Sequence, residues 1–503
     1  MNLNATGSKT RDWLFIFILG AIYRLVLLWQ FPALYGGDSV GRLFYRDSIF
    51  FGHWLPLLQS LIVAGFDVTN SVMIIRVVII LAGSLSALGF YEFVRVISRN
   101  RNQPFSDQAS WRRLPLIAGI LFTLCPLYVY LSIVPYQEVI FLGLMFGGLA
   151  FLLGNEDRKL WGYLLYGLAC LTRYEAWLLL PVLFFLEVRR LWHAAGGRII
   201  HWIPAFKLLL ALGWAPLVWM LLNEFHWGEF TAFLFQKEGS VYIWHSHFSL
   251  SIAATYLTRM LWWIVKYGSP LVLFAVPGIY FFRKERSRFP LPVRILGLLC
   301  LFVLVLLTFI AGPEFAHAHR FAAIPLSLVL IFTAVGIERF VGHLQQKRTR
   351  AFTILLPMVL IILSIYSAIP VARANQRPDN STAYQVARFL DRALSANEKA
   401  VIVAQGFREY PQVIPMPYQR IAAQSNLNRN RMLSASHLGL NGEDTVARLI
   451  SEQNVRYVVI CSKFEPWRAS DRFFMEYVKA EKNHLRRMEK GMAEVYELGR
   501  VDF

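Results

Sequence analysis

A carboxylate on a sharp turn follows the first long apolar segment, in the stretch Tyr35-Gly36-Gly37-Asp38-Ser39. The two glycines let the backbone turn sharply and approach a ligand closely. Asp38 then faces water at the edge of an apolar segment, which suits a general base that acts on a partly lipidic substrate. The same residues also fit a helix that ends at the two glycines, with Asp38 as the N-cap of the next helix. This stretch alone leaves both interpretations open.

Further ionisable side chains lie inside or beside apolar segments. A charged residue at the centre of a bilayer costs about 2.5–3.5 kcal/mol on insertion scales, so each one is a candidate functional residue. They come from separate loops that we predict to lie on one side of a membrane, so a single outward-facing cavity could collect them. The candidates are Asp38, Asp47, Glu138, Arg173, Glu175, Glu314, His317, His319 and Arg320.

Each acidic candidate also has a structural interpretation. Asp47 follows Arg46, and the two residues suit a local ion pair. Glu138 lies in a short turn, where the dipole of the following helix favours a negative charge. Its functional interpretation is a second carboxylate at the mouth of the cavity.

The basic candidates have two interpretations as well. Arg173 lies deep in an apolar segment, so it must pair with a carboxylate, such as that of Glu175, or hold an anion. Arg320 begins an apolar segment, where it suits a bidentate contact with a lipid phosphate. Snorkelling of the Arg320 side chain towards water is the alternative.

Histidine pairs at a spacing of two residues, His317/His319 and His245/His247, raise the question of a metal site. A third Cys or His is not near either pair in the sequence, so we predict neither a metal nor another cofactor. The sequence also contains no Walker motif, no phosphate-binding glycine loop and no GxSxG motif. These absences argue against a nucleotide-driven pump and against a soluble nucleotide-sugar donor.

The composition predicts a polytopic membrane protein. The chain has 503 residues, of which 56% are hydrophobic and 17% are charged, whereas a soluble domain has about 25% charged residues. Many windows reach about 20 apolar residues, the length that crosses a bilayer. The net charge of +19 does not indicate a nucleic-acid partner, because the basic residues cluster in short loops between apolar segments, as in cytoplasmic loops.

The charge pattern predicts about eleven membrane spans, with a cytoplasmic N-terminus and an extracytoplasmic C-terminus in the inner (plasma) membrane. Two short helices with Arg173 to Glu175 at the turn would let the 160–190 segment cross out and back. The other predicted spans are residues 13–34, 72–96, 114–134, 139–154, 202–222, 256–282, 291–312, 321–342 and 352–371.

Two large outside loops and a soluble domain complete the predicted architecture. Residues 1–373 form the membrane module, and its outside loops cover residues 35–70 and 223–255. In the first loop, residues 42–62 suit one or two helices in the membrane interface. Residues 374–503 predict a small extracytoplasmic α/β domain, with helices at 384–394 and 446–450 and strands at 400–403, 457–461 and 493–498.

The motifs resemble those of the GT-C superfamily of integral-membrane glycosyltransferases, in particular the bacterial branch related to protein O-mannosyltransferases and aminoarabinose transferases. Asp38 is similar to the acidic residue of the family's first outside loop. One departure is Ser39, because many members have a paired Asp-Glu there, so Asp47 or Glu138 would have to supply a second acid. The other similar stretches are His53-Trp-Leu-Pro56-Leu-Leu, Leu168-Ala-Cys-Leu-Thr-Arg173-Tyr-Glu175-Ala-Trp and His317-Ala-His319-Arg320-Phe-x-x-x-Pro325.

This resemblance implies an inverting hexosyltransferase that takes a sugar such as mannose from a polyprenyl-phosphate donor. Asp38 would deprotonate a hydroxyl of a protein, lipid or glycan acceptor, and Arg320, with Arg173, would hold the leaving phosphate. The resemblance also gives His53, His317, His319, Asp47, Glu138 and Glu175 to the substrate site. A flippase of lipid-linked sugars and a non-catalytic scaffold for envelope assembly are the alternatives. No inverted repeat supports the flippase, and the scaffold gives Asp38 no role.

Overall fold

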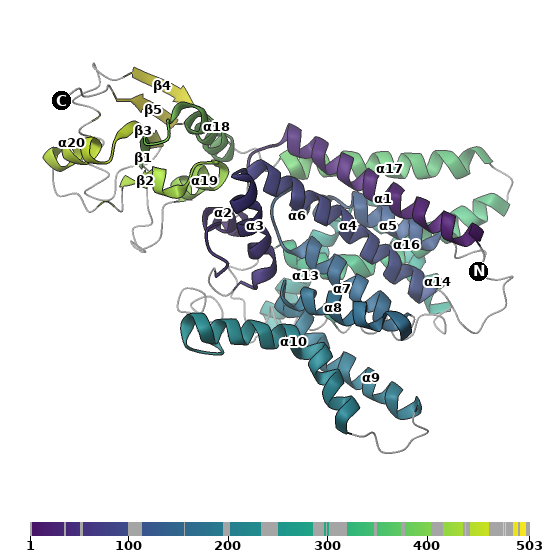
Figure 1. The fold of residues 1–503 in the computed structure, drawn as a ribbon. Coiled ribbons are helices and arrows are strands. Elements are labelled where there is room, and N and C mark those ends of the chain that lie inside the picture. The colour runs from purple at the N-terminus through teal and green to yellow at the C-terminus, as the bar shows by residue number, and fades with distance from the viewer. Residues whose placement is uncertain are drawn as a thin grey trace. The chain divides into compact units, whose positions relative to one another are not determined.

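The chain folds into two compact units, which we describe separately (Figure 1). The first unit consists of Met1–Leu27, Phe50–Ser60 and Val77–Val371, and the second of Leu28–Ile49, Leu61–Arg76 and Ala372–Phe503. The computed structural model describes residues 3–34, 37–50, 54–98, 113–154, 156–194, 202–232, 250–284, 296–297, 299–300, 319–346, 350–373, 378–403, 416–435, 438, 443–461, 476, 478, 486–490 and 493–498.

Helices make up the first unit, because its long apolar segments satisfy their backbone hydrogen bonds internally. The first turn of α4, up to Arg76, belongs to the second unit, as does the end of α1. The helices are α1 (Leu3–Gln30), α4 (Val72–Ser98), α5 (Leu114–Leu124), α6 (Pro126–Ile133), α7 (Glu138–Leu153), α8 (Lys159–Cys170), α9 (Leu180–Ala194), α10 (Trp202–Trp227), α13 (Leu250–Tyr267), α14 (Ala275–Lys284), α16 (Ala323–Gln346) and α17 (Arg350–Arg373).

Four helices of the described residues are long and apolar enough to cross a membrane: Lys9–Gln30, Val72–Ser98, Ile203–Trp227 and Arg320–His343. Two bent helix pairs raise this number to six if each pair is one span. Three shorter apolar helices of the described residues do not reach this length: Pro56–Thr69, Glu138–Leu153 and Ile362–Val371. The predicted total of about eleven spans stays a prediction, and most of the predicted span 291–312 lies outside the described residues.

Two predicted spans, 114–134 and 256–282, are each bent, and a proline begins the helix after each break. In 114–134, α5 and α6 meet at 53° around Pro126, where the ring removes a backbone donor and clashes with the preceding turn. In 256–282, α13 is followed by a short 3₁₀ helix, η4 (Pro270–Phe274), and the two sides meet at 114°. Ser269, at the bend, has a φ of 75°.

Other helix boundaries differ from the predicted loops. α10 continues to Trp227 and α13 begins at Leu250, so helical residues occupy both ends of the predicted loop 223–255. Asn223, the first polar residue of that loop, is helical, and its side-chain amide donates to the carbonyl of Trp219 at 2.8 Å. The middle of this loop, residues 233–249, lies outside the described residues.

The predicted break in the 160–190 segment is confirmed. α8 ends at Cys170, a 3₁₀ helix η3 (Tyr174–Leu179) follows, and α9 begins at Leu180. Arg173 therefore lies in the short connection between two helices rather than inside one long helix.

A five-stranded sheet with the order β2-β1-β3-β5-β4 forms the core of the second unit. β1 pairs in parallel with β2 and β3, whereas β5 is antiparallel to β3 and β4. Buried Val401, Val446 and Val458 join strands and helix. The elements are β1 (Lys399–Val403), β2 (Met432–Ser434), β3 (Val455–Cys461), β4 (Arg486–Lys490), β5 (Ala493–Glu497), α18 (Pro378–Ala393), α19 (Met416–Gln424) and α20 (Glu443–Glu452).

The predicted strands at 400–403, 457–461 and 493–498 and the predicted helices at 384–394 and 446–450 are confirmed in position. Two helices also occupy the predicted first outside loop, α2 (Gly37–Phe44) and α3 (Pro56–Thr69). α2 belongs to the second unit and packs against α19. The location of α2 and α3 in a membrane interface stays a prediction.

Candidate functional site

Two arginines and two glutamates that the sequence singled out lie together in the first unit. Arg173 Nε donates to both carboxylate oxygens of Glu175, at 3.0 Å each. The two Nη atoms of Arg173 also bind carboxylates, Nη1 that of Glu138 and Nη2 that of Glu175. Arg320 approaches the same group, with its Nε 3.7 Å from Oε1 of Glu138. The expected pairing of Arg173 with carboxylates is therefore confirmed.

Local hydrogen bonds hold Arg173 in this position. The backbone N–H of Arg173 donates to the carbonyl of Ala169 at the end of α8, at 3.0 Å. The hydroxyl of Tyr166 crosses the connection and donates to the carbonyl of Ala176 at 2.8 Å. The indole of Trp177 donates back to the carbonyl of Cys170. Hydrogen bonds thus join α8 to η3 across the connection that carries Arg173.

Glu138 is the first residue of α7, where the helix dipole stabilises a negative charge. Glu138 is 2% exposed, Arg173 is 6% exposed and Glu175 is 5% exposed. Ions in such a dry environment are stable only when they are paired and hydrogen-bonded. A negative charge on Glu138 is therefore balanced by the helix dipole and by both arginines.

The charges of this cluster balance, with two arginines and two glutamates. Arg173 divides its guanidinium between both carboxylates, whereas the Arg320 side chain is 20% exposed. The rings of Tyr136 and Phe321 lie 5.9 and 5.4 Å from the Arg320 guanidinium carbon. Arg320 is therefore the better placed of the two cations to meet an incoming anion.

A small pocket lies between these four side chains, and its wall also includes Phe141, Phe321 and Ile324. Apolar walls around charged groups lower the local dielectric constant and strengthen electrostatic interactions. The apolar wall thus strengthens the ion pairs of the cluster, of which Arg320 is the more exposed cation.

A second stretch that the sequence singled out touches this turn. The backbone N–H of Leu57, at the start of α3, donates to the carbonyl of Leu171 at 3.1 Å. The ring of Phe50 stacks on Trp219, whose indole donates to the hydroxyl of Tyr174 at 3.3 Å. The end of the first loop therefore lies against the connection that carries Arg173.

Asp38 lies in the second unit, in the first turn of α2, with its side chain partly exposed. α1 ends at Gln30 and α2 begins at Gly37, so the interpretation of a helix ending at Gly36-Gly37 with Asp38 as an N-cap is wrong. Gly37 is the first residue of α2 and Asp38 the second. The structure brings Asp38 to a helix N-terminus, where the dipole stabilises its carboxylate.

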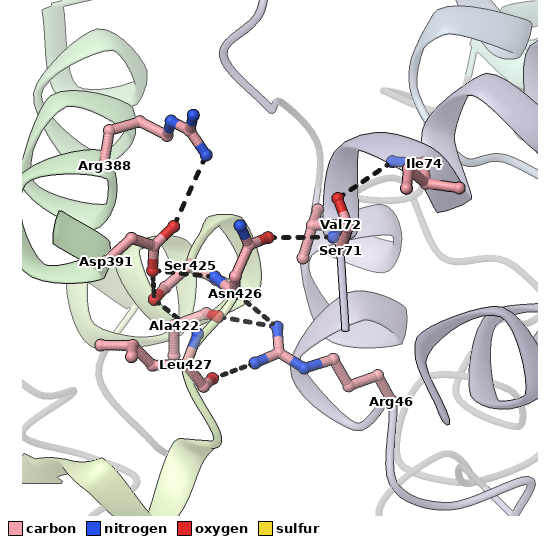
Figure 2. Close-up of polar contacts among 10 residues, drawn as sticks. All are labelled: Arg46, Ser71, Val72, Ile74, Arg388, Asp391, Ala422, Ser425, Asn426 and Leu427. Carbon is pink, nitrogen blue, oxygen red and sulfur yellow. Dashed lines mark hydrogen bonds and ion pairs between the residues drawn. The ribbon is translucent and has the colours of Figure 1, made fainter. Parts of the chain in front are cut away.

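Arg46, two residues after α2, binds backbone carbonyls at the end of α19 within the second unit (Figure 2). Its guanidinium donates to the carbonyls of Ala422 at 3.2 Å and Ser425 at 2.8 Å, and to that of Leu427. A cation at these last carbonyls of a helix satisfies orphan acceptors and complements the dipole. Asp47, the next residue, is exposed.

Several predicted residues are not described in full. His53 and His317 lie outside the described residues, and so do Glu314 and the pair His245/His247. His319 begins the 3₁₀ helix η7 (His319–Ala322), which leads into α16, but only its backbone is described. Within the described part of the chain no group of three or more His, Cys, Asp or Glu residues is arranged to hold a metal. The absence of a cofactor stays a prediction.

The sequence interpretation missed the contacts that tie the first loop to the C-terminal residues. Gln424 Oε1 accepts from the backbone N–H of Leu34 at 2.6 Å. Asn426 Oδ1 accepts from that of Val72 at 3.1 Å, as Figure 2 shows. Gln424 is the last residue of α19, and Asn426 follows two residues later. Polar residues are so common at helix C-termini that they do not predict a distant partner.

No family model matches this sequence, and no curated protein matches it. The crystal structure of ArnT from Cupriavidus metallidurans bound to undecaprenyl phosphate is similar over 100% of this chain and 99% of that chain, with 12% identity and a TM-score of 0.57. The structure of the same protein in the apo state is similar over 98% of both chains, with 14% identity and a TM-score of 0.55.

The likeness shows that this chain has the fold of ArnT over its whole length. The fold that the resemblance implies is therefore confirmed. This fold and the long apolar helices are those of an integral membrane protein.

Proposed function

We propose that this protein is an inverting glycosyltransferase that moves a sugar from a polyprenyl-phosphate donor to an acceptor hydroxyl on the outer face of the membrane. The observation that carries the proposal is the full-length similarity to ArnT, whose crystal structure holds undecaprenyl phosphate. The motifs around Asp38, Arg173 and Arg320 agree with it. A hexose such as mannose is the proposed sugar, and the acceptor is a protein, a lipid or a glycan.

The proposed reaction is one displacement at the anomeric carbon. Asp38 accepts the proton of the acceptor hydroxyl as that oxygen attacks. A new bond forms between the acceptor oxygen and the anomeric carbon while the bond from that carbon to the phosphate oxygen breaks. The electron pair of the broken bond leaves with the phosphate, which departs as polyprenyl phosphate. The configuration at the anomeric carbon is inverted.

Arg320 is the proposed binding residue for the donor phosphate, because it is the more exposed cation of the cluster. Glu138 would orient Arg320 through their 3.7 Å contact, and Arg173 would hold Glu138 and Glu175 in place. His53, His317, His319 and Asp47 remain proposed substrate contacts. In this account Arg173 acts through the two carboxylates and does not hold the phosphate itself.

The first test compares Asp38→Asn with Asp67→Asn, a matched change at an exposed acid of α3 in the same loop. We expect loss of a general base to slow transfer of radiolabelled sugar from a polyprenyl-phosphate donor by about 10²–10⁴-fold. Donor binding and expression of the Asp38→Asn protein should be unchanged, because the proposed base does not contact the phosphate.

Undiminished transfer by Asp38→Asn would show that another acid, such as Asp47 or Glu138, is the base. Equal losses in the Asp38→Asn and Asp67→Asn proteins would assign the effect to the loop structure instead. No transfer by the unmodified protein with any polyprenyl-phosphate sugar would contradict the proposed function itself.

A further inference from the structure

Glu138 contacts both arginines of the cluster in the first unit through one oxygen. Its Oε1 accepts from Nη1 of Arg173 and lies 3.7 Å from Nε of Arg320. Arg173 has a second carboxylate partner, because its Nε donates to both oxygens of Glu175 at 3.0 Å each. Loss of the charge on Glu138 would therefore leave Arg173 in an ion pair and would remove a negative charge beside Arg320.

Aromatic rings hold the Arg320 guanidinium beside Glu138. The ring of Phe321 lies 5.4 Å from the guanidinium carbon of Arg320 and 5.5 Å from that of Arg173. The ring of Tyr136, two residues before Glu138, lies 5.9 Å from the guanidinium carbon of Arg320. A cation near the face of a ring gains about 0.5–2 kcal/mol. These contacts do not depend on the charge of Glu138.

An anion that approaches the cluster from its exposed side meets Arg320 with Glu138 close behind it. The side chain of Arg320 is 20% exposed, whereas that of Glu138 is 2% exposed. Like charges that are partly shielded from water repel each other more strongly than charges in water. The carboxylate of Glu138 therefore lowers the affinity of Arg320 for an anion, and the reduction grows with the charge of the anion.

The proposed transfer changes the charge of the lipid phosphate. In the donor the phosphate is a diester, which carries one negative charge. The released polyprenyl phosphate is a monoester, and a phosphate monoester carries about 1.5–2 negative charges at pH 7. Without an opposing carboxylate, the arginines would bind the product more tightly than the donor, and the product would block the site.

We propose that Glu138 discriminates against the released polyprenyl phosphate at Arg320 and so favours its exchange for a new donor. Its carboxylate repels the doubly charged product more than the singly charged donor. Most differences in affinity between related ligands of one site lie in the rate of dissociation, so the repulsion speeds product release. This inference rests on the proposed function, because it takes Arg320 as the residue that binds the phosphate.

The test compares two lipid probes that carry no sugar, a short-chain polyprenyl phosphate and its methyl ester. At pH 8 the first carries two negative charges and the second carries one, while the lipid chain is the same. The ratio of the two affinities thus isolates the effect of the second charge. Both affinities are measured by titration calorimetry with the purified full-length protein in a neutral detergent.

Glu138→Gln should raise the affinity for polyprenyl phosphate about tenfold more than the affinity for the methyl ester, because the second charge no longer faces a carboxylate. Glutamine keeps a side-chain oxygen that can accept from Arg173. A role of Glu138 in packing alone would change both affinities by the same factor.

The unmodified protein gives a second measurement, which does not depend on the folding of a variant. Its affinities for the two probes should lie within about threefold of each other, because the repulsion from Glu138 offsets the attraction of the second charge to Arg320. A preference of the unmodified protein for the doubly charged probe by more than about tenfold would contradict the inference.

Glu187→Gln is the matched control, because Glu187 is a largely buried glutamate in another ion-pair cluster of the first unit. Its Oε2 lies 2.7 Å from Nζ of Lys159 and 3.0 Å from Nε of Arg190. The ratio of the two affinities in Glu187→Gln should equal that of the unmodified protein. The same rise of the ratio in Glu187→Gln and Glu138→Gln would assign the effect to the net charge of the protein and overturn the inference.

The inference and the proposed function fail on different results. An unchanged ratio in a folded Glu138→Gln protein that binds both probes overturns the inference and leaves Arg320 as the proposed phosphate contact. Failure of the unmodified protein to bind either probe contradicts that contact in the proposed function, and the inference falls with it.

Discussion

Arg173 forms ion pairs with two glutamates in the first unit, one near it in the sequence and one distant. It is 6% exposed and binds the carboxylates of Glu138 and Glu175. From the sequence, an arginine in an apolar segment predicts an ion pair, and Glu175 two residues away is an obvious partner. Glu138 is 35 residues distant, and only packing of α7 against α8 makes that pair. The residue types therefore predicted that Arg173 pairs with a carboxylate, whereas tertiary packing determines that Glu138 is one of its partners.

At this scale, we expect Arg173→Met to destabilise the protein by about 3–5 kcal/mol, because two glutamates lose their buried partner. Arg173→Met combined with Glu138→Gln and Glu175→Gln should recover part of that loss, since no uncompensated glutamate is left, although the partly exposed Arg320 loses its contact with Glu138. Thermal unfolding of the single and triple variants in the same detergent measures both effects. A triple variant less stable than the single variant would show that the cluster is not held by charge pairing.

Elements were predicted best where hydrophobic length or alternation was strong. The strands at 400–403 and 457–461 and the break at Arg173 are in their predicted places. The bends at Pro126 and Ser269 were missed, because a proline in an apolar run looks the same whether the helix kinks slightly or turns through 114°. The short strands β2 and β4 were missed as well, since three residues and a charged segment carry no clear alternation.

The contact between α2 and α19 gives a prediction about elements. Arg46→Met should loosen the end of α19 and the attached α2, because three carbonyls lose a charged donor. We expect a loss of about 1.5–3 kcal/mol and faster amide hydrogen exchange in residues 37–44 and 416–424. Arg431→Met, which removes another arginine–carbonyl contact of this unit, should leave exchange in residues 37–44 unchanged. Unchanged exchange there in Arg46→Met would contradict the role of Arg46.

The second unit shows why sequence order is a poor guide to the whole molecule. A change of composition near residue 374 predicts a soluble domain that begins there, yet Leu28–Ile49 and Leu61–Arg76 pack into the same compact unit. Arg46, Gln424 and Asn426 make the connecting hydrogen bonds. No local sequence pattern predicts these contacts, because one partner in each hydrogen bond is a backbone group, which does not depend on the residue type.

An isolated fragment of residues 374–503 should therefore unfold without cooperativity. The carbonyls of Ala422 and Ser425 and the amides of Gln424 and Asn426 would lose their partners from the first loop. Near-ultraviolet circular dichroism during heating checks this expectation, with the full-length protein as the reference. A sharp transition of the fragment alone would show that the first loop is not needed for its fold.

The most direct test of the central claim is the stoichiometry of transfer by the purified protein in liposomes. A polyprenyl-phosphate sugar labelled in both the sugar and the phosphate would be supplied on the outer leaflet together with a membrane extract as acceptor. The proposed displacement predicts one polyprenyl phosphate released for each sugar transferred, with an inverted anomeric configuration. Movement of the intact labelled lipid between leaflets, with no sugar transferred and no polyprenyl phosphate released, would contradict the account and identify a translocator instead.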